Sequence, residues 1–237
     1  MSNSIIDLSG KVVVITGASG IQGPEHVKLL KQAGAIVVAT DIKETEIILD
    51  VTDPESIKKA VQAIIGQHGK IDILINNAGS TGKSSADWDQ IIKVNLTGTY
   101  NCCQIIGAAM KQGSIINVSS IYGLVGPDFS IYKSSEYAGK PMGVPAAYAA
   151  SKGGVIALTK YFASLYAPKI RVNCVTPGGI FDNQPENFVK KYSAKTMLGR
   201  MAKKNEVSGA ILYLASDLSS YVTGANLVID GGLSSRA

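Results

Sequence analysis

Tyr148 and Lys152 stand four residues apart in the segment YAASK. Residues at this spacing share one face of a helix. A phenol with a pKa near 10 is a poor base at neutral pH. An ammonium about 4 Å away, at an effective dielectric constant of about 20, would favour the tyrosinate by roughly 4 kcal/mol, or about three pKa units. The pair therefore predicts acid–base chemistry, although an exposed structural pair has the same spacing.

Another group of residues suits the phosphates of a nucleotide. In TGASGIQG, Gly17, Gly20 and Gly23 follow an apolar run and precede a helical pattern. Glycines there let backbone N–H groups approach a pyrophosphate, and a helix N-terminus adds positive charge. Asp41 follows the next apolar run, where a carboxylate would accept hydrogen bonds from a ribose and repel a 2′-phosphate. The pattern favours NAD over NADP, and only the nearby Lys43 would favour a phosphate.

The elements that must position these residues alternate between short apolar runs and longer helical patterns. This alternation indicates an α/β fold of the Rossmann type, a doubly wound parallel sheet of about seven strands with helices on both faces. The Asp41–Asp50 crossover is too short for a helix of ordinary length. We expect a single domain over residues 1–237, with strands at 11–16, 35–40, 46–50, 71–77, 113–120, 169–177 and 226–230, and helices at 23–33, 53–67, 87–110, 146–167 and 205–215.

Further motifs follow the other expected strands. They are NNAG at 76–79, VNLTG with Asn95, INVSS ending at Ser119 and Ser120, and DGG at 230–232. With TGASGIQG before them and YAASK between INVSS and DGG, these motifs resemble those of the short-chain dehydrogenase/reductase family over nearly the whole chain. The family's use of the second serine of such a pair implies Ser120 rather than Ser119.

The resemblance implies a catalytic tetrad of Asn95, Ser120, Tyr148 and Lys152. Ser120 would hydrogen-bond the substrate oxygen and Tyr148 would exchange the proton. Lys152 would lower the pKa of the tyrosine and bind the nicotinamide ribose, while Asn95 would hold a proton-relay water. The implied NAD contacts are Gly17, Ser19, Gly20, Ile21, Gly23, Asp41, Asp50, Val51, Asn77, Ala78, Gly79, Tyr148, Lys152, Pro177, Gly178 and Ile180.

The chain departs from the compact members of this family in three places. The glycine spacing of TGASGIQG is that of the family's larger, two-lobed members, whereas NNAG and YAASK are of the compact type. Ser120 and Tyr148 are about twice as far apart as is usual, so we interpret residues 121–146 as an inserted loop on the substrate side. The usual threonine after Pro177 and Gly178 is missing, and Asn183 is the candidate substitute.

The inserted loop carries Tyr132, Lys133 and Lys140. Aromatic rings there could stack on a sugar or base and lysines could pair with phosphate; the alternative is a surface loop or an oligomer contact. Between Pro127 and Lys204, twelve Lys and Arg face four Asp and Glu. This excess is either a solvated basic surface or a field that attracts an anionic small-molecule substrate. The segments SIYG and RVNCVTPGGIFDNQP are also similar to flagellin-modification oxidoreductases of nonulosonic-acid (sialic-acid-like) biosynthesis.

We therefore expect an NAD(H)-dependent oxidoreductase that interconverts an alcohol and a ketone. The favoured substrate is a sugar, sugar phosphate or nucleotide-sugar of bacterial surface-sugar biosynthesis. Alternatives are another secondary alcohol, a 3-oxoacyl compound, or an NAD-sensing role without catalysis. The family resemblance also implies a homodimer or homotetramer.

Other features argue against competing classes of protein. There is no run of about 18 apolar residues and no secretory signal, so we expect a cytoplasmic protein without a membrane partner. We expect no metal site, disulfide framework or nucleic-acid partner, because the three cysteines suit buried thiols and no recognition motif accompanies the basic residues. Gly82, Lys83 and Ser84 resemble part of a P-loop, but Asn77 occupies the place of its first glycine.

Overall fold

The computed structural model describes residues 5–81, 87–137 and 139–235. A seven-stranded parallel sheet lies at its centre, in the order β3-β2-β1-β4-β5-β8-β9. The three residues that resemble part of a P-loop, Gly82–Ser84, are outside the described residues. The strands are β1 (Val12–Thr16), β2 (Ile36–Asp41), β3 (Ile47–Ile48), β4 (Ile73–Asn76), β5 (Gly113–Val118), β8 (Ile170–Pro177) and β9 (Asn226–Ile229).

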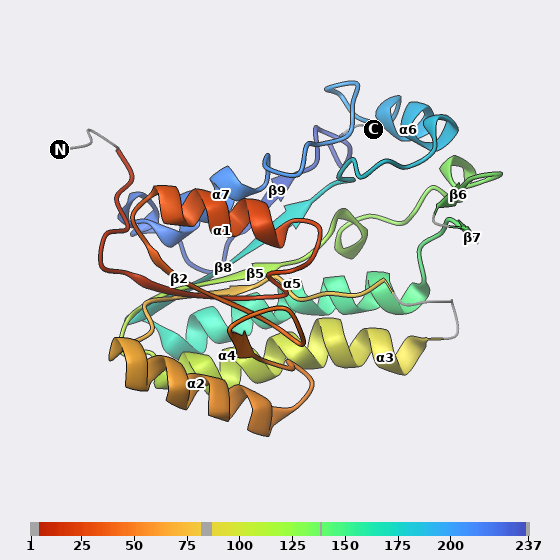
Figure 1. Cartoon of the computed structure of the whole chain (residues 1–237). Helices are drawn as coiled ribbons and strands as arrows, with labels where there is room; N and C mark the ends of the chain where they lie inside the picture. Colours follow the sequence, from red (N-terminus) through yellow and green to blue (C-terminus); the bar gives the residue numbers. More distant parts are fainter. Residues whose placement is uncertain (1–4, 82–86, 138, 236–237) are drawn as a thin grey trace.

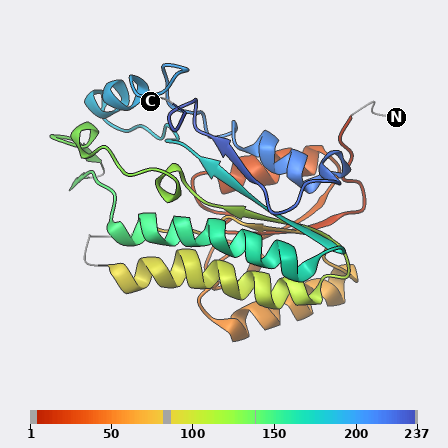
Figure 2. The same cartoon turned by 180° about the vertical axis from the view of Figure 1, so that it is seen from behind.

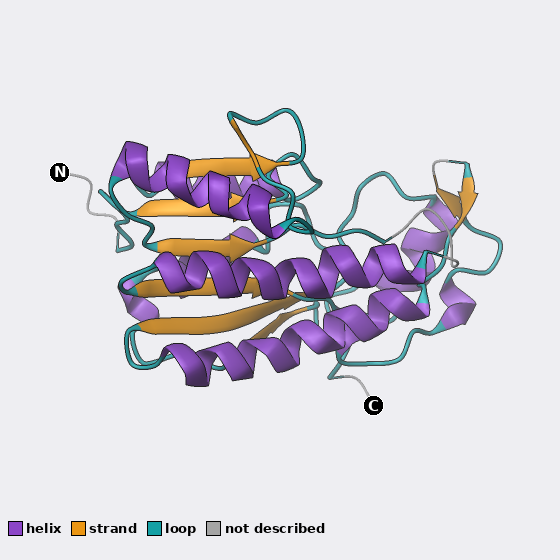
Figure 3. Ribbon diagram, turned by 90° about the horizontal axis from the view of Figure 1, so that it is seen from below, coloured by secondary structure: helices purple, strands orange, loops and turns teal. Residues whose placement is uncertain are grey.

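Helices cover both faces of this sheet, which confirms the predicted fold class (Figure 1). On one face lie α1 (Gly23–Gln32) and α7 (Ser208–Ala215). On the other lie α2 (Pro54–His68), α4 (Gly98–Ala109) and α5 (Ala146–Tyr166), side by side as Figure 3 shows. Within the described residues, no helix is long and apolar enough to cross a membrane.

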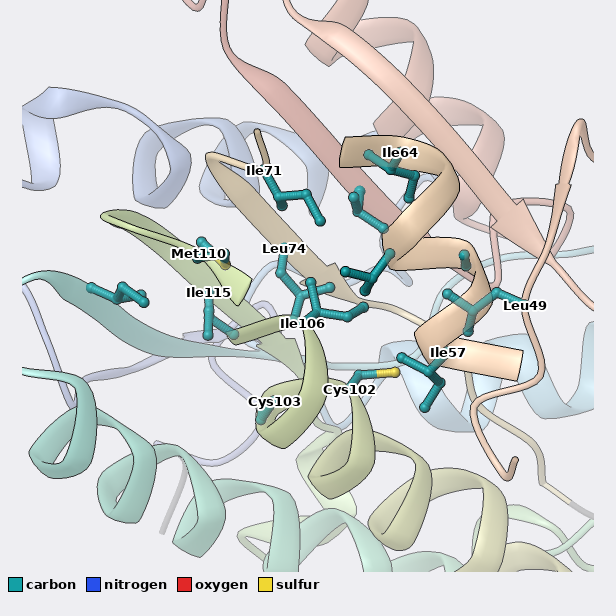
Figure 4. Packing of buried hydrophobic residues seen from close by; sticks show 14 of the residues in the cluster. Leu49, Ile57, Ile64, Ile71, Leu74, Cys102, Cys103, Ile106, Met110 and Ile115 are labelled. Carbon is teal, nitrogen blue, oxygen red and sulfur yellow. The ribbon is translucent and has the colours of Figure 1, made fainter. Parts of the chain in front are cut away.

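The central strands are continuous apolar runs because both of their faces are buried. All five residues of β1 are buried. One apolar cluster lies between the sheet and α2, α4 and α5; Figure 4 shows Ile57 and Ile64 of α2 together with Leu74 of β4 and Ile106 of α4. Another cluster lies under α1 and α7. The two clusters therefore fix the helices on both faces of the sheet, and the parallel pairing of the strands brings their carboxyl ends to one edge.

The helix expected at 87–110 is interrupted. It consists of α3 (Trp88–Ile92), a π-helical turn at Lys93–Thr97, and α4. The sequence pattern predicted the extent of this segment but not the wide turn, which often occurs at functional sites. Asn95 lies in the turn and is fully buried.

Residues 121–146 are more than a surface loop. They contain two 3₁₀ turns (Ile121–Gly123 and Phe129–Ile131) and a small hairpin of β6 (Glu136–Tyr137) and β7 (Lys140–Pro141). They pack against α6 (Glu186–Ser193), a helix that the sequence analysis did not predict. Figures 1 and 2 show the hairpin and α6 together beyond the carboxyl ends of the strands. A third apolar cluster joins them, formed by Ile131, Tyr132, Phe188, Tyr192 and Met201.

Candidate active site

A cavity of about 950 Å³ lies along the carboxyl ends of β1, β2, β4, β5 and β8. Parallel α/β sheets bind their ligands at this edge, and the volume is at the upper end for ligand pockets. Most of the expected site residues line it. They are Gly17, Ser19, Gly20, Ile21, Asp41, Asp50, Val51, Asn77, Ala78, Gly79, Ser120, Tyr132, Tyr148, Lys152, Pro177, Gly178 and Ile180.

The glycine turn after β1 is shaped by close packing. Gly17 has a φ of +65°, and a Cβ there would lie 2.6 Å from the Cα of Ala78. The Asn77 side chain donates to the Gly17 carbonyl at 2.8 Å, which holds the turn against the segment after β4. Gly23 does not line the cavity; a Cβ there would lie 2.3 Å from the Ala18 carbonyl oxygen. Gly23 therefore packs closely against Ala18 at the start of α1.

Asp41 ends β2 and lines the cavity beside this turn. Its carboxylate accepts from the Ser19 amide at 3.0 Å and from the Ile42 amide at 2.7 Å. Lys43 lies nearby and forms an exposed ion pair with Glu44 at 3.4 Å. This end of the cavity thus presents a carboxylate together with backbone amides, a combination that fits the adenosine half of a dinucleotide.

The two serines after β5 have different environments. Ser119 donates through its Oγ to the carbonyl of Lys152 at 2.8 Å and is buried. Ser120 lines the cavity, accepts from the Tyr122 amide at 3.3 Å, and forms a hydrogen bond with Tyr148. The serine that the family resemblance implies is therefore the one beside the tyrosine.

Tyr148 and Lys152 both lie in the first turns of α5 and line the cavity. The Lys152 ammonium donates to the Val118 carbonyl at 2.8 Å and lies 5.8 Å from the centre of the Tyr148 ring. Burial lowers the pKa of Lys152 to about 8. Burial raises the pKa of Tyr148, and the hydrogen bond with Ser120 opposes this rise. Burial thus acts against the lowering of the tyrosine pKa that we expected from Lys152.

Asn95 lies behind the cavity wall. Its side-chain oxygen accepts from the Ser80 amide at 2.7 Å, and its amide nitrogen donates to the Ser80 carbonyl at 2.9 Å and to Ser151 Oγ at 3.1 Å. A Cβ on Gly79 would lie 3.6 Å from Asn95 and 3.5 Å from the Lys152 ammonium. The side chain therefore holds the segment after β4 close to Lys152.

The end of the cavity beside Tyr148, which we call the substrate end because we expected the substrate there, is aromatic and apolar. Tyr122, Tyr132 and Tyr192 line it together with Met142 and Phe188. The hydroxyls of Tyr122 and Tyr132 form a hydrogen bond with each other. Burial raises the pKa of all three tyrosines, so they present neutral hydroxyl groups.

Three residues that we expected at this end lie elsewhere. Lys133 and Lys140 are exposed and outside the cavity, as is Asn183. Gln184 lines the cavity instead and donates to the Ile180 carbonyl at 2.8 Å. The two lysines that we expected to pair with a phosphate therefore do not line this cavity.

Two lysines of the basic stretch form ion pairs with acidic residues of the same stretch. Lys195 pairs with Asp128 at 2.8 Å and Lys204 with Asp182 at 2.6 Å. Among the described residues that line the cavity, Lys43 and Lys152 are the only lysines or arginines. Neither belongs to the aromatic wall of the substrate end.

Some wall residues were missed although the sequence held a signal for two of them. Phe188 and Tyr192 stand four apart in ENFVKKYS, so they share one face of a short amphipathic helix. Tyr122 and Met201 had no comparable local signal. They line the cavity only because the chain returns to it after β5 and after α6.

Comparison with known proteins agrees with this geometry. A family model described as enoyl-(acyl carrier protein) reductase matches residues 16–234. The 3-oxoacyl-[acyl-carrier-protein] reductase of Thermotoga maritima is 39% identical, over 95% of this chain and 98% of that protein. The NADP-dependent mannitol dehydrogenase of Alternaria alternata is 32% identical, over 96% of this chain and 94% of that protein.

Solved structures give the same result. A short-chain dehydrogenase from Leptospira borgpetersenii with bound NAD⁺ has a TM-score of 0.87 and 36% identity, covering 96% of this chain and 94% of that one. The aldohexose dehydrogenase of Thermoplasma acidophilum has a TM-score of 0.81 and 33% identity, covering 97% and 96%. These comparisons give no support to the flagellin-modification subgroup.

The relatives include proteins described with NAD⁺ and with NADP. The close packing at Gly17 and the helix N-terminus after the turn suit the pyrophosphate that both dinucleotides share. The chain is thus an oxidoreductase that acts on a CH–OH group with NAD or NADP, and it belongs to the short-chain dehydrogenase/reductase family.

Proposed function

We propose that this protein uses NAD(H) to interconvert an alcohol and its oxidation product. The alcohol is an uncharged compound with several hydroxyl groups, such as a sugar or polyol, and the product is the corresponding ketone or lactone. The observation that supports it best is the convergence of Ser120, Tyr148 and Lys152 beside an aromatic, neutral compartment. NAD, when bound, supplies the hydride acceptor. The remaining chemistry belongs to side chains of this chain.

In this proposal Tyr148 moves the proton and Ser120 holds the reacting oxygen. The raised pKa of Tyr148 keeps it a neutral phenol, which suits it to donate a proton to a carbonyl oxygen in the reductive direction. In the oxidative direction the Tyr148–Lys152 pair first loses a proton to solvent, and the resulting tyrosinate accepts the proton of the alcohol. Lys152, held by the Val118 carbonyl, keeps a positive charge close to the tyrosine while it is protonated.

Asp41 supports NAD over NADP. A 2′-phosphate beside its carboxylate would meet like charge, while ribose hydroxyls could donate to it. Lys43 does not neutralise the Asp41 carboxylate, because it is already paired with Glu44.

The neutral wall supports a free sugar or polyol over a sugar phosphate or nucleotide-sugar. Placing an anionic group among Met142, Phe188 and the tyrosines would remove it from water with no described cation beside it. Burying an unpaired charge is strongly unfavourable. The hydroxyls of Tyr122 and Tyr132 can instead exchange hydrogen bonds with the hydroxyls of a substrate. That the substrate belongs to bacterial surface-sugar biosynthesis stays a prediction from the sequence.

A second candidate is a 3-oxoacyl substrate. The apolar side chains of Met142, Val144, Phe188 and Met201 could accept an alkyl chain. The 39% identity to the Thermotoga maritima reductase favours it as well. A sensing role without catalysis would not explain why Ser120, Tyr148 and Lys152 lie together in the cavity.

We also propose a homodimer or homotetramer. Exposed apolar side chains lie on the outer faces of α4 and α5: Tyr100 is 43% exposed, Tyr161 60% and Leu165 51%. Exposed aromatic and aliphatic groups gathered on adjacent helices are typical of subunit interfaces. The molar mass in solution tests this.

The test is NADH formation from NAD⁺ with a panel of free sugars, polyols, cyclic alcohols, sugar phosphates and a 3-hydroxyacyl thioester. We expect turnover of uncharged hydroxylated compounds, reduced by at least about 100-fold in Tyr148→Phe. Binding of NADH to that variant should be retained. Turnover of only the phosphates would contradict the uncharged substrate, and turnover of only the thioester would favour the second candidate. Activity unchanged in Tyr148→Phe would contradict the mechanism.

A further inference from the structure

Tyr192 lies where the third apolar cluster meets the turn after β8. It is 2% exposed and comes from α6. The backbone amide of Gly179 donates to its hydroxyl oxygen at 2.5 Å. A Cβ on Gly179 would lie 2.7 Å from the ring, and one on Gly178 would lie 3.2 Å from the hydroxyl. The turn and the tyrosine are therefore packed without spare room.

The other hydrogen bonds of this turn come from backbone groups. The Gly178 amide donates to the Ile229 carbonyl at 2.9 Å, and the Gly179 carbonyl accepts from the Ala202 amide at 3.0 Å. Of these three hydrogen bonds, only that of Tyr192 uses a side chain. The tyrosine is thus the one partner in this set that a substitution can remove without altering the backbone.

Tyr192 also continues a row of aromatic rings from the inserted residues. Its ring centre lies 5.8 Å from that of Phe188, which lies 5.3 Å from that of Tyr132. Tyr132 in turn hydrogen-bonds Tyr122 through the hydroxyls. All four line the cavity, so the substrate wall and the turn at Gly178–Gly179 form one packed unit.

We propose that Tyr192 is a positioning residue, whose hydroxyl holds the Gly178–Gly179 turn in the place that hydride transfer requires. The proposal rests on the proposed function. Burial raises the pKa of the Tyr192 hydroxyl, which consequently stays neutral. Because its oxygen accepts from Gly179, its own proton is directed away from that amide. The same residue therefore joins the substrate wall to the backbone that closes the other side of the cavity.

Tyr192→Phe tests this, with Tyr166→Phe as its matched control. Tyr166 also uses its hydroxyl to bond the backbone, donating to the Cys103 carbonyl at 2.8 Å, but it does not line the cavity. Both variants lose one hydroxyl and keep the ring. We would measure kcat, KM, the dissociation constant of NADH, and amide hydrogen exchange at Gly179 in the protein without cofactor.

In Tyr192→Phe we expect faster exchange of the Gly179 amide and a kcat lowered roughly 10- to 100-fold, because a small misplacement of reacting groups is costly. KM and the NADH dissociation constant should change less than about threefold, since the lost contact is to the turn. Tyr166→Phe should retain the wild-type kcat and Gly179 exchange. A Tyr192→Phe protein with the wild-type kcat, or with unchanged Gly179 exchange, would overturn the proposal. A wild-type protein without turnover would instead overturn the proposed function, and this proposal with it.

Discussion

His26 connects α1, the helix after the cofactor turn, to α7, and its titration should control stability at acidic pH. The side chain is fully buried, and its Nδ1 lies 2.8 Å from the Ser208 hydroxyl. Its Nε2 is buried without a hydrogen-bond partner in the described part of the chain. Burial lowers the pKa of His26 from an ordinary 6.5 to about 4. The neutral ring is therefore required by the folded state.

The magnitude follows from this shift. The unfolded chain binds the proton more tightly, so stability rises with pH through this window. A difference of about 2.5 pKa units corresponds to about 3 kcal/mol. This contribution is complete above pH 6.5 and is lost progressively as the pH falls to about 4. Between pH 7 and pH 5 we expect a loss of about 2 kcal/mol from this one residue.

The assay is urea unfolding followed by circular dichroism at pH 7, 6 and 5, at one protein concentration. His26→Gln should be less stable than the wild type at pH 7, because it disturbs a packed site. Its loss of stability between pH 7 and pH 5 should, however, be smaller by about 2 kcal/mol. His68, on α2, is the only other histidine and provides the matched control, since His68→Gln should keep the wild-type dependence. An equal pH dependence in His26→Gln and wild type would refute the reasoning.

Three further outcomes are expected. Asp41→Ser should raise the ratio of kcat/KM for NADP to that for NAD at least about 10-fold, because a like charge beside the 2′-phosphate is removed; an unchanged ratio contradicts this. The kcat/KM of alcohol oxidation should rise with pH through about 8, as the pair of Tyr148 and Lys152 loses a proton, whereas a flat profile from pH 7 to 9 contradicts it. Gly23→Ala should lower the free energy of unfolding by about 2 kcal/mol or more, because the added methyl group overpacks the contact with Ala18. Gly66→Ala, at an exposed position of α2, should raise the free energy of unfolding by about 0.5–1 kcal/mol. Calorimetry that shows the reverse order of stability would refute this.

The fold and the cofactor end of the cavity could be predicted because their signals are local. The apolar run of β1, the glycines after it and Asp41 at the end of β2 depend on neighbours in the sequence. Parallel strands then bring their carboxyl ends to one edge without further information. The short crossover after Asp41 was predicted for the same reason, since its length alone excludes a helix.

The substrate end could not be predicted in the same way. Tyr192 and Tyr132 are far apart in the sequence, and only the packing of α6 on residues 121–146 brings their rings together with Phe188. Lys133 and Lys140 were expected at a phosphate because of their type, but their backbone places them outside the cavity. Residue type indicates what a side chain can do and not where it lies.

By itself the sequence determined the seven-stranded parallel architecture, the pairing of Tyr148 with Lys152 on one helix face, and the carboxylate of Asp41 at the end of β2. The tertiary structure alone decided that Gly23 packs against Ala18 and that Asn95 holds Ser80. It also decided that the substrate wall is neutral. The physical reason is that periodicity and spacing are properties of neighbouring residues, whereas burial, charge pairing and pKa depend on groups that only folding brings into contact.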